Sequence, residues 1–432
     1  MLIEFSVANY RSIRERQTLS LVAGPDSAHV RRNVVRRDGE ALGLLRSMVI
    51  YGANASGKSN LLRAIETLRQ LVQNSGPAYQ KGQPLPVTPF LFARASAGEP
   101  TEFELIFIAD DGVRYHYGCV VSPQRVLKEW LVAYPSGRAQ RWFEREAAAG
   151  NDAQRWWFGP NFKGERGQRK VWQALTRDNA LFLSSALQLN NAQLRPAFGW
   201  ITQKLIVLVP GIGLNPFLSL ELLGQEEGRA QIMRFMQAAD IGIDGLELHE
   251  EDAVAQQPAA ALPPGTLRIH FETGSPPGSA PVVQKQFRVV TVHKRCDSDE
   301  NVALDLGEES DGTQKLFEFT GGWLRALERG ATLFVDELDR SLHPHMTRFL
   351  VSLFHGHSND KGAQLVFTTH DTTLLDADLL RRDQVWFIEK DRQGASHLYP
   401  LLDYSPRKDE ALERGYLKGR YGAIPFIGNL AV

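Results

Sequence analysis

The segment Gly52–Ser59 reads Gly-Ala-Asn-Ala-Ser-Gly-Lys-Ser and matches the pattern GxxxxGK[ST] at every position. Glycines allow a tight turn in which successive backbone N–H groups point inward, and such a turn binds anions. A helix that starts at the end of the turn adds the positive end of its dipole. In this pattern Lys58 reaches the β- and γ-phosphates, and the hydroxyl of Ser59 is a ligand of Mg²⁺. The segment therefore predicts a site for ATP and Mg²⁺.

The residues on either side of this loop have the periodicities that such a site requires. Leu45–Tyr51 is a short apolar run typical of a buried strand, and Ser59–Gln73 repeats its leucines at helical spacing. The order is strand, loop, helix, which makes an ordinary glycine-rich turn a poor explanation. We expect the nucleotide to contact the following residues: Gly52, Asn54, Ala55, Ser56, Gly57, Lys58, Ser59 and Asn60.

A second apolar run, Ala331–Val335, ends in the two carboxylates Asp336 and Glu337. The C-terminal ends of core strands are where open α/β sheets bind ligands. We therefore predict that Asp336, together with Ser59, holds the metal ion. The neighbouring Glu337 can orient the attacking water and take its proton, so we predict that it is the catalytic base.

Two further polar segments lie in this part of the chain. Gln364–Thr368 is another buried strand, and His370 follows it at a place where it can contact the γ-phosphate. Ser310–Lys315 opens a predicted helix over Thr313–Glu328. That opening fits either an ordinary N-cap or an anion-binding helix N-terminus.

The remaining pattern indicates α/β lobes separated by an insertion. Aspartates and a glycine separate Glu102–Ala109 from Arg114–Val121, which is typical of a β-hairpin. From residue 303 onward strands alternate with helices, one of them expected over Ser341–Phe354, and this favours a mainly parallel sheet. Proline, glycine and serine mark 253–266 and 272–281 as exposed loops. We expect an N-terminal lobe at 1–160, a helical or irregular insertion at 161–285 and a C-terminal lobe at 286–432.

Composition excludes several classes of protein. A formal net charge of −1 excludes a globally basic nucleic-acid binder. Cys119 and Cys296 lack the spacing of metal ligands and fit thiols in a reducing compartment. No signal peptide and no long apolar run is visible, so we expect a soluble, cytoplasmic protein with no membrane partner.

The order of motifs resembles the ABC-type ATPase heads of SMC, RecF and OLD-like proteins. The elements are the phosphate loop, a long insertion, SDGTQK from Ser310, TLFVDELDRSLHP from Thr332 and LVFTTHD from Leu365. The start MLIEFSVANYRSI and the segment Tyr416–Pro425 are similar to bacterial AAA-family ATPases of the RloA or abortive-infection type. This resemblance implies an α/β P-loop head with an antiparallel β subdomain and a mostly helical central insertion.

The resemblance also implies roles for residues outside the phosphate loop. Ser310, Gly312 and Gln314 take the place of the ABC signature, which completes the ATP site of a second subunit, although SDGTQ departs from the usual SGG form. His370 matches the switch histidine. Asn9 and Arg11 match a strand-edge motif that lies near the nucleotide in such heads. ABC-type heads also have a loop whose glutamine links ATP to the partner domain. Three residues of this chain remain candidates for that glutamine: Gln80, Gln83 and Gln124.

The function implied is that of an ATPase that forms a homodimer or higher homo-oligomer around ATP. It would regulate or load an effector in antiphage defence; the alternative is a RecF-like repair ATPase that acts directly on DNA. OLD proteins carry a C-terminal Toprim nuclease, and too few residues follow His370 for one. We therefore expect the effector, a nuclease or toxin, to be a separate chain.

Two clusters leave nucleic-acid contact open. The first is basic and fits contact with nucleic acid or a partner as well as a solvated helix face: Arg407, Lys408, Arg414, Lys418 and Arg420. The second mixes cations with aromatic rings, for which we expect core packing of the tryptophans and keep base stacking as the alternative: Arg141, Trp142, Arg155, Trp156 and Trp157.

Overall fold

The computed structural model describes residues 1–36, 42–148, 154–209, 216–239, 242–253, 266–269, 284–407 and 410–425. It divides into two compact units. The core unit comprises residues 1–210, 326–340 and 350–432, and the inserted unit comprises 211–325 and 341–349. The chain passes from one unit to the other within helices α9 (Asp311–Arg329) and α10 (Pro344–His355).

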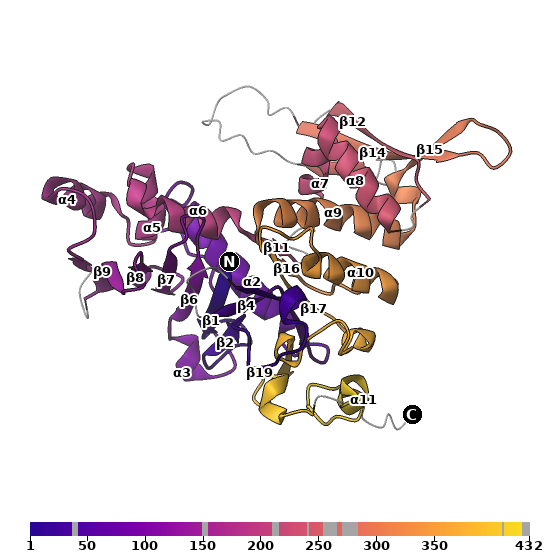
Figure 1. Ribbon diagram of the computed structural model, residues 1–432. Helices are drawn as coiled ribbons and strands as arrows, with labels where there is room; N and C mark the ends of the chain where they lie inside the picture. Colours follow the sequence, from indigo (N-terminus) through magenta and orange to yellow (C-terminus); the bar gives the residue numbers. More distant parts are fainter. Residues whose placement is uncertain are drawn as a thin grey trace. The chain divides into compact units, whose positions relative to one another are not determined.

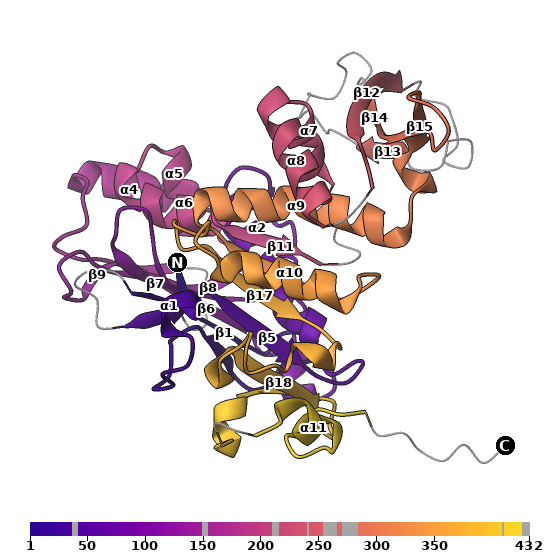
Figure 2. The ribbon, with the colours of Figure 1, turned by 45° about the vertical axis from the view of Figure 1, so that its right-hand side comes forward.

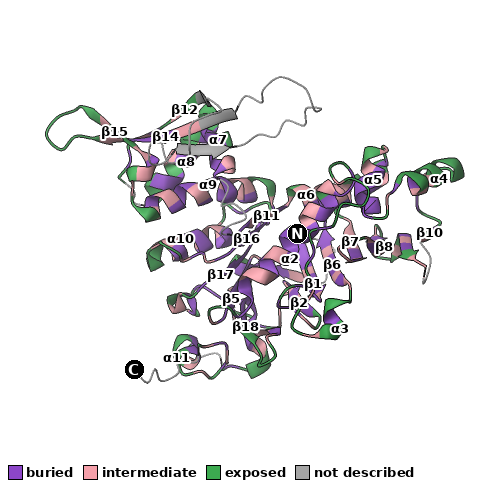
Figure 3. Cartoon of the chain, turned by 180° about the vertical axis from the view of Figure 1, so that it is seen from behind, coloured by how far each residue is buried: buried purple, intermediate pink, exposed green. Residues whose placement is uncertain are grey.

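A parallel sheet forms the centre of the core unit (Figure 1), with the strand order β11-β16-β17-β5-β18-β19. Its strands are short apolar runs, and the central ones are buried along their whole length, as Figure 3 shows. Burial on both faces is the usual reason for unbroken apolar strands in parallel sheets. The strands are β11 (Leu205–Leu208), β16 (Thr332–Val335), β17 (Gln364–Thr368), β5 (Ser47–Tyr51), β18 (Val385–Lys390) and the antiparallel β19 (Ser396–Pro400).

An antiparallel sheet forms the second layer of the core unit, in the order β10-β9-β8-β7-β6-β1-β2. The expected hairpin is confirmed, because β6 and β7 pair from Thr101↔Val121 to Ile108↔Arg114. The strands are β1 (Leu2–Ala8), β2 (Gln17–Ser20), β6 (Thr101–Ile108), β7 (Arg114–Val121), β8 (Val126–Tyr134), β9 (Gln140–Ala147) and β10 (Gln154–Phe158). A small ribbon is made of β3 (Val34–Arg36) and β4 (Gly43–Leu45).

One buried side chain, Gln364 at the start of β17, ties the first strand of the antiparallel sheet to the parallel sheet. Its Oε1 accepts from the N–H of Leu2 (2.6 Å) and from the hydroxyl of Thr332 (3.1 Å). Its Nε2 donates to the carbonyls of Leu2 (3.1 Å) and Leu45 (3.0 Å). A fully buried amide with partners on every side satisfies its polar atoms and fixes these strands against one another.

Helices α5 (Phe182–Gln188) and α6 (Arg195–Gln203) of the core unit pack against α2 (Lys58–Asn74), which follows the glycine-rich turn. A buried ion pair anchors one of them, α5, to the antiparallel sheet. Glu129 accepts from the guanidinium of Arg145 (2.9 Å) and from the N–H groups of Phe182 (2.6 Å) and Leu183 (2.9 Å). The other helices are α1 (Val30–Asn33), α3 (Arg94–Ala97), α4 (Arg166–Leu175) and α11 (Leu412–Leu417).

The inserted unit combines helices with an antiparallel sheet in which β14 pairs with β12, β13 and β15. A buried hydroxyl, that of Ser219 in α7, donates to the carbonyl of Phe317 in α9 at 2.6 Å. The elements are α7 (Phe217–Leu223), α8 (Glu226–Ala238), β12 (Gly245–Ala253), β13 (Thr266–Ile269), β14 (Gln284–Lys294) and β15 (Asn301–Asp305).

The expected α/β fold with an antiparallel subdomain is confirmed, and one helix boundary is wrong. The helix predicted over Ser341–Phe354 begins only at Pro344, because Ser341 has a left-handed backbone (φ 61°) that a helix cannot contain. Proline suits the first helical turn, where its missing N–H costs nothing. The predicted loop at 272–281 and all but the end residues of the predicted loop at 253–266 lie outside the described residues; Ala253 ends β12 and Thr266 begins β13. Among the described residues, no helix has the length and apolar character needed to cross a membrane.

Candidate functional site

The turn between β5 and α2 has the backbone that its sequence predicts. Ala55 (φ 62°) and Gly57 (φ 114°) both have positive φ values, so the chain reverses direction within a few residues. A side chain on Gly52 would collide with the carbonyl of Ile388 in β18. Glycine is therefore required at Gly52 by the neighbouring strand, and at Gly57 by the backbone angle itself.

This turn lines a pocket of about 270 Å³, which we call the loop pocket. It brings together residues from the ends of several strands, since Glu337 follows β16, His370 follows β17 and Lys390 ends β18. The remaining lining residues are those of the turn and the first turn of α2: Asn54, Ala55, Ser56, Gly57, Lys58, Ser59 and Asn60. Carboxyl ends of neighbouring parallel strands thus meet at one edge of the sheet, as open α/β sheets require of a ligand site.

Lys58 is the buried cation of the loop pocket. Its Nζ donates to the carbonyls of Gly52 (2.6 Å) and Ala53 (3.1 Å), which holds the ammonium over the turn. Burial lowers the pKa of Lys58, and the nearby carboxylates, Asp336 first among them, act in the opposite direction. An ammonium that has lost much of its hydration is strongly stabilised when an anion binds beside it.

A single hydroxyl of the next strand, that of Thr368, bonds to both residues after β16. It donates to Oδ1 of Asp336 at 2.7 Å and accepts from the N–H of Glu337 at 2.8 Å. Asp336 is buried, whereas Glu337 reaches the loop pocket from a left-handed backbone (φ 52°). A positive φ is unusual for a residue with a side chain, and such strain is concentrated at functional sites.

His370 lies at the edge of the loop pocket beside the carboxylates. Its backbone N–H faces both carboxylate oxygens of Asp339, at 3.2 and 3.3 Å. Burial is the main cause that lowers the pKa of His370, and the charge of Lys58 adds to it. The imidazole is therefore neutral at neutral pH, with one ring N–H to donate.

The structure places Asn9 away from the loop pocket. Its amide nitrogen donates to the carbonyls of Ser96 and Glu99, both at 2.8 Å, and its Oδ1 accepts from the N–H of Phe90 at 3.0 Å. This side chain therefore holds the loop before β6, and little of its hydrogen-bonding capacity is left for a ligand. The guanidinium of Arg11 is exposed and lies over the ring of Tyr10. Neither residue lines the loop pocket.

The signature-like residues belong to the inserted unit, where Ser310 and Gly312, but not Gln314, line a pocket of about 570 Å³ at the start of α9. Ser310 caps the helix by accepting from the N–H of Thr313 at 3.2 Å. The amide of Gln314 donates to the carbonyl of Glu309 at 2.8 Å, so it points back to the preceding turn. A Cβ on Gly312 would lie 3.0 Å from the carbonyl of Ser341, so this position has no room for a side chain.

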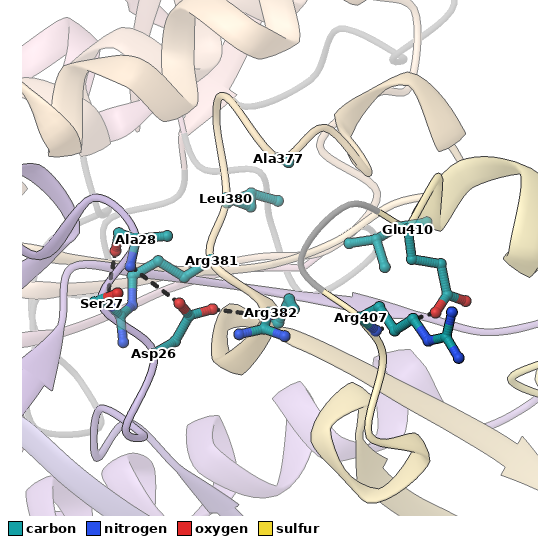
Figure 4. A pocket seen from close by; sticks show the side chains of 10 residues that line it. Asp26, Ser27, Ala28, Ala377, Leu380, Arg381, Arg382, Arg407 and Glu410 are labelled. Atoms are coloured by element: carbon teal, nitrogen blue, oxygen red, sulfur yellow. Dashed lines mark hydrogen bonds and ion pairs between the residues drawn. The ribbon is translucent and has the colours of Figure 1, made fainter.

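A further pocket of about 130 Å³ in the core unit is rich in arginine (Figure 4). Arg382 pairs with Asp26 at 2.8 Å, and the fully buried Arg381 pairs with Asp383 at 2.5 Å. Because acids neutralise both guanidinium groups, this pocket is a packing feature and a poor anion site.

The two clusters that left nucleic-acid contact open differ in the structure. In the basic cluster Arg414 and Lys418 are exposed on and after α11, the C-terminal helix drawn in yellow in Figure 2. Lys408 lies outside the described residues. In the aromatic cluster Trp142 belongs to the core, as expected, whereas Trp157 is 44% exposed against Arg141.

Sequence patterns did not identify some residues that surround the loop pocket. Lys390 lines it directly, and Thr368 bonds to the carboxylate of Asp336 and to the backbone N–H of Glu337. Ser12 and Ser396 contact the back of the phosphate-loop turn. Thr368 and Ser12 lie within segments that resemble ABC-type heads, but no pattern singled out these two positions. Lys390 and Ser396 lie outside those segments.

In the described part of the chain, no cluster of three His, Cys, Asp or Glu side chains is placed to hold a metal ion alone. The oxygen donors Ser59 and Asp336 fit Mg²⁺, which commonly takes its other ligands from phosphate and water.

Comparison with known proteins places this geometry in a family. A model described as "AAA domain, putative AbiEii toxin, Type IV TA system" matches residues 47–200 and 226–376, which is more than half of the chain. No curated protein matches the chain. The match includes the phosphate-loop turn, both carboxylates and His370, and it excludes Asn9 and Arg11.

Solved structures of similar fold have low sequence identity to the chain. The SMC head domain from Thermotoga maritima is 12% identical with a TM-score of 0.40, covering 92% of this chain and 98% of that one. An SMC head bound to the C-terminal winged-helix domain of ScpA is 11% identical (TM-score 0.42; 92% and 96% covered). The recombination mediator RecF is 15% identical (TM-score 0.36; 92% and 98% covered). The chain belongs to the AAA-domain family named above.

Proposed function

We propose that the protein binds ATP with Mg²⁺ in the loop pocket and hydrolyses it. The observation that carries this proposal is the convergence of Lys58, Ser59, Glu337 and His370 on one pocket from separate strand ends. Each group has chemistry that phosphoryl transfer needs, namely a cation for the phosphates, a hydroxyl for the metal, a base and a neutral hydrogen-bond donor.

The chain's own residues would divide the reaction as follows. The N–H groups of the turn and Lys58 bind the phosphates, while Ser59 and Asp336 hold the metal ion, which supplies charge neutralisation. Glu337 orients the attacking water and accepts its proton. The ring N–H of His370 donates to the γ-phosphate, and its neutral state keeps it available for this bond.

We further propose that two copies of the chain share the nucleotide. Support comes from the pocket at the start of α9, which is lined by Ser310, Gly312 and Ser341. A helix N-terminus favours a phosphate. In the shared arrangement the γ-phosphate bound by one chain meets this surface of the other, so ATP stabilises a homodimer by its higher affinity for the paired state.

The biological role we propose is regulation of a separately encoded effector in antiphage defence. Support comes from the description of the family, which names a putative toxin and a toxin–antitoxin system. ATP-dependent pairing of the heads would present or release the effector. Co-expression with the neighbouring reading frame, with wild-type chain or Lys58→Ala, tests this role through cell growth and phage plaque counts. Equal growth and plaque counts in all combinations would contradict it.

The activity itself is tested by three variants. Lys58→Ala should abolish ATP binding, and Glu337→Gln should keep binding but stop turnover. Lys361→Ala, a change of an exposed lysine outside the loop pocket, serves as the matched control. Isothermal titration with ATP·Mg²⁺ and phosphate release are the measurements. Native turnover in Glu337→Gln would show that the base lies elsewhere, and unchanged affinity in Lys58→Ala would refute the site.

A further inference from the structure

Two serines and an asparagine form a buried chain of hydrogen bonds behind the phosphate-loop turn. Ser396, the first residue of β19, is fully buried, and Ser12, which lies between β1 and β2, is almost as buried. The hydroxyl of Ser396 lies 2.6 Å from the carbonyl oxygen of Ser56 and 2.9 Å from the hydroxyl of Ser12. The amide of Asn60, in the first turn of α2, donates to that Ser12 hydroxyl at 2.8 Å.

The chemistry of these groups fixes the direction of the bonds. A serine hydroxyl has one proton, and a carbonyl oxygen can only accept. The proton of Ser396 therefore points to the carbonyl of Ser56. The remaining contact is satisfied when the hydroxyl of Ser12 donates to Ser396. The bonds then run in one direction from Asn60 through Ser12 and Ser396 to Ser56.

The end of this chain determines how one peptide group of the turn is oriented. In a planar trans peptide, the C=O and the following N–H point in opposite directions. Ser396 holds the carbonyl of Ser56 on the buried side of the turn, so the N–H of Gly57 in the same peptide faces the opposite side, where Gly57 lines the loop pocket. We propose that Ser396, supported by Ser12, is a positioning residue that orients the Gly57 N–H toward the nucleotide phosphates before ATP arrives.

The packing around Gly57 supports this role. A Cβ on Gly57 would collide with the hydroxyl of Ser396 and lie 2.9 Å from that of Ser12. The serines therefore pack directly against the turn and leave it no room to rotate this peptide. A second bond, from the N–H of Ser396 to the carbonyl of Ser12 at 2.8 Å, fixes β19 to the same place. An anion site that is oriented in advance does not lose binding energy to reorganisation.

The proposal rests on the proposed ATP site and predicts an effect on nucleotide affinity. Backbone N–H groups of such a turn contact the phosphates that ATP and ADP share. Ser396→Ala should therefore weaken the binding of ATP and of ADP by a similar factor, about tenfold. It should leave the ratio of the two affinities unchanged. Fluorescent ATP and ADP analogues, titrated against the full chain, give both dissociation constants.

A matched control separates positioning from general stability. Ser219 is an equally buried serine whose hydroxyl also donates to a carbonyl at 2.6 Å, but it lies in the inserted unit. Ser219→Ala should lower the melting temperature like Ser396→Ala and keep native ADP affinity. Native ADP affinity in Ser396→Ala, or an equal loss in both variants, would overturn the proposal.

A double-mutant cycle tests the link through Ser12. If Ser12 acts through Ser396, the loss of ADP affinity in Ser12→Ala/Ser396→Ala should be smaller than the product of the two single losses. Independent, multiplicative losses would refute the chain of bonds. Failure of the proposed function has a different signature, because in that case Lys58→Ala and the wild type would bind ATP equally.

Discussion

Replacing Thr368 by valine removes one hydroxyl and keeps the volume of the side chain. The hydroxyl of Thr368 is fully buried and holds both carboxylate residues, through Asp336 Oδ1 at 2.7 Å and the N–H of Glu337 at 2.8 Å. Loss of the bond to a charged partner costs about 1.5–3 kcal/mol, and an unpaired buried N–H costs about 1–3 kcal/mol. We expect Thr368→Val to lower the free energy of unfolding by about 3 kcal/mol.

The same change should slow ATP turnover more than it weakens binding. Glu337 has a left-handed backbone, and without the bond to Thr368 it relaxes away from the position of the attacking water. The phosphate-loop turn is untouched, so we expect kcat to fall at least about tenfold while the dissociation constant for ATP changes less than about twofold. Steady-state phosphate release, nucleotide titration and urea denaturation measure the three quantities.

Thr332 provides the control for this prediction. It is equally buried, at the opposite end of β16 from Asp336, and its hydroxyl donates to Gln364 at 3.1 Å. Thr332→Val should cost about 1 kcal/mol of stability and leave kcat unchanged. If Thr368→Val keeps native kcat, or Thr332→Val slows turnover as much, the hydroxyl of Thr368 does not position the base.

Three further predictions concern other parts of the chain. Gly312→Asp should bind ATP normally but lose ATP-dependent association in light scattering. The new Cβ would lie 3.0 Å from the Ser341 carbonyl, and the aspartate adds a negative charge. Normal hydrolysis by this variant would refute the shared site. Glu129→Ala should lower the free energy of unfolding, measured by urea denaturation, by about 3–5 kcal/mol, because it leaves Arg145 buried without its ion pair. A decrease below about 1 kcal/mol would contradict this role. Burial lowers the pKa of His355 to about 3, so as pH falls below 6.5 the unfolded chain binds a proton that the native state excludes. Stability should then fall by about 1.4 kcal/mol per pH unit down to about pH 4, and His355→Gln should remove this part of the slope.

The phosphate-loop turn and both carboxylates could be predicted because each is contiguous in sequence. Gly52–Ser59 carries its whole pattern in one segment, and Asp336 and Glu337 directly follow an apolar run. The structure confirms the strand, turn and helix around them. Local sequence is sufficient where the chemistry needs consecutive backbone groups.

The residues that escaped prediction are brought together only by the tertiary fold. Ser12 and Ser396 lie at opposite ends of the chain, and an isolated serine carries no periodic signal. The strand β9 was not predicted, because its sequence QRWFEREA has no regular alternation of apolar and polar residues. The hydrogen bonds of Asn9 were likewise invisible in the sequence, because its side chain holds the loop before β6, which lies about ninety residues further along the chain.

The side chain of Gln364 has a mechanical consequence for the antiparallel sheet. It fixes the start of β1 at Leu2, while Ser12, just beyond the end of the same strand, is fixed to the phosphate-loop turn. The strand β1 is thus attached at both of its ends to the parallel sheet. A strand that is attached at both ends resists sliding along its length. We therefore expect the register of β1 against the parallel sheet to stay the same when nucleotide binds.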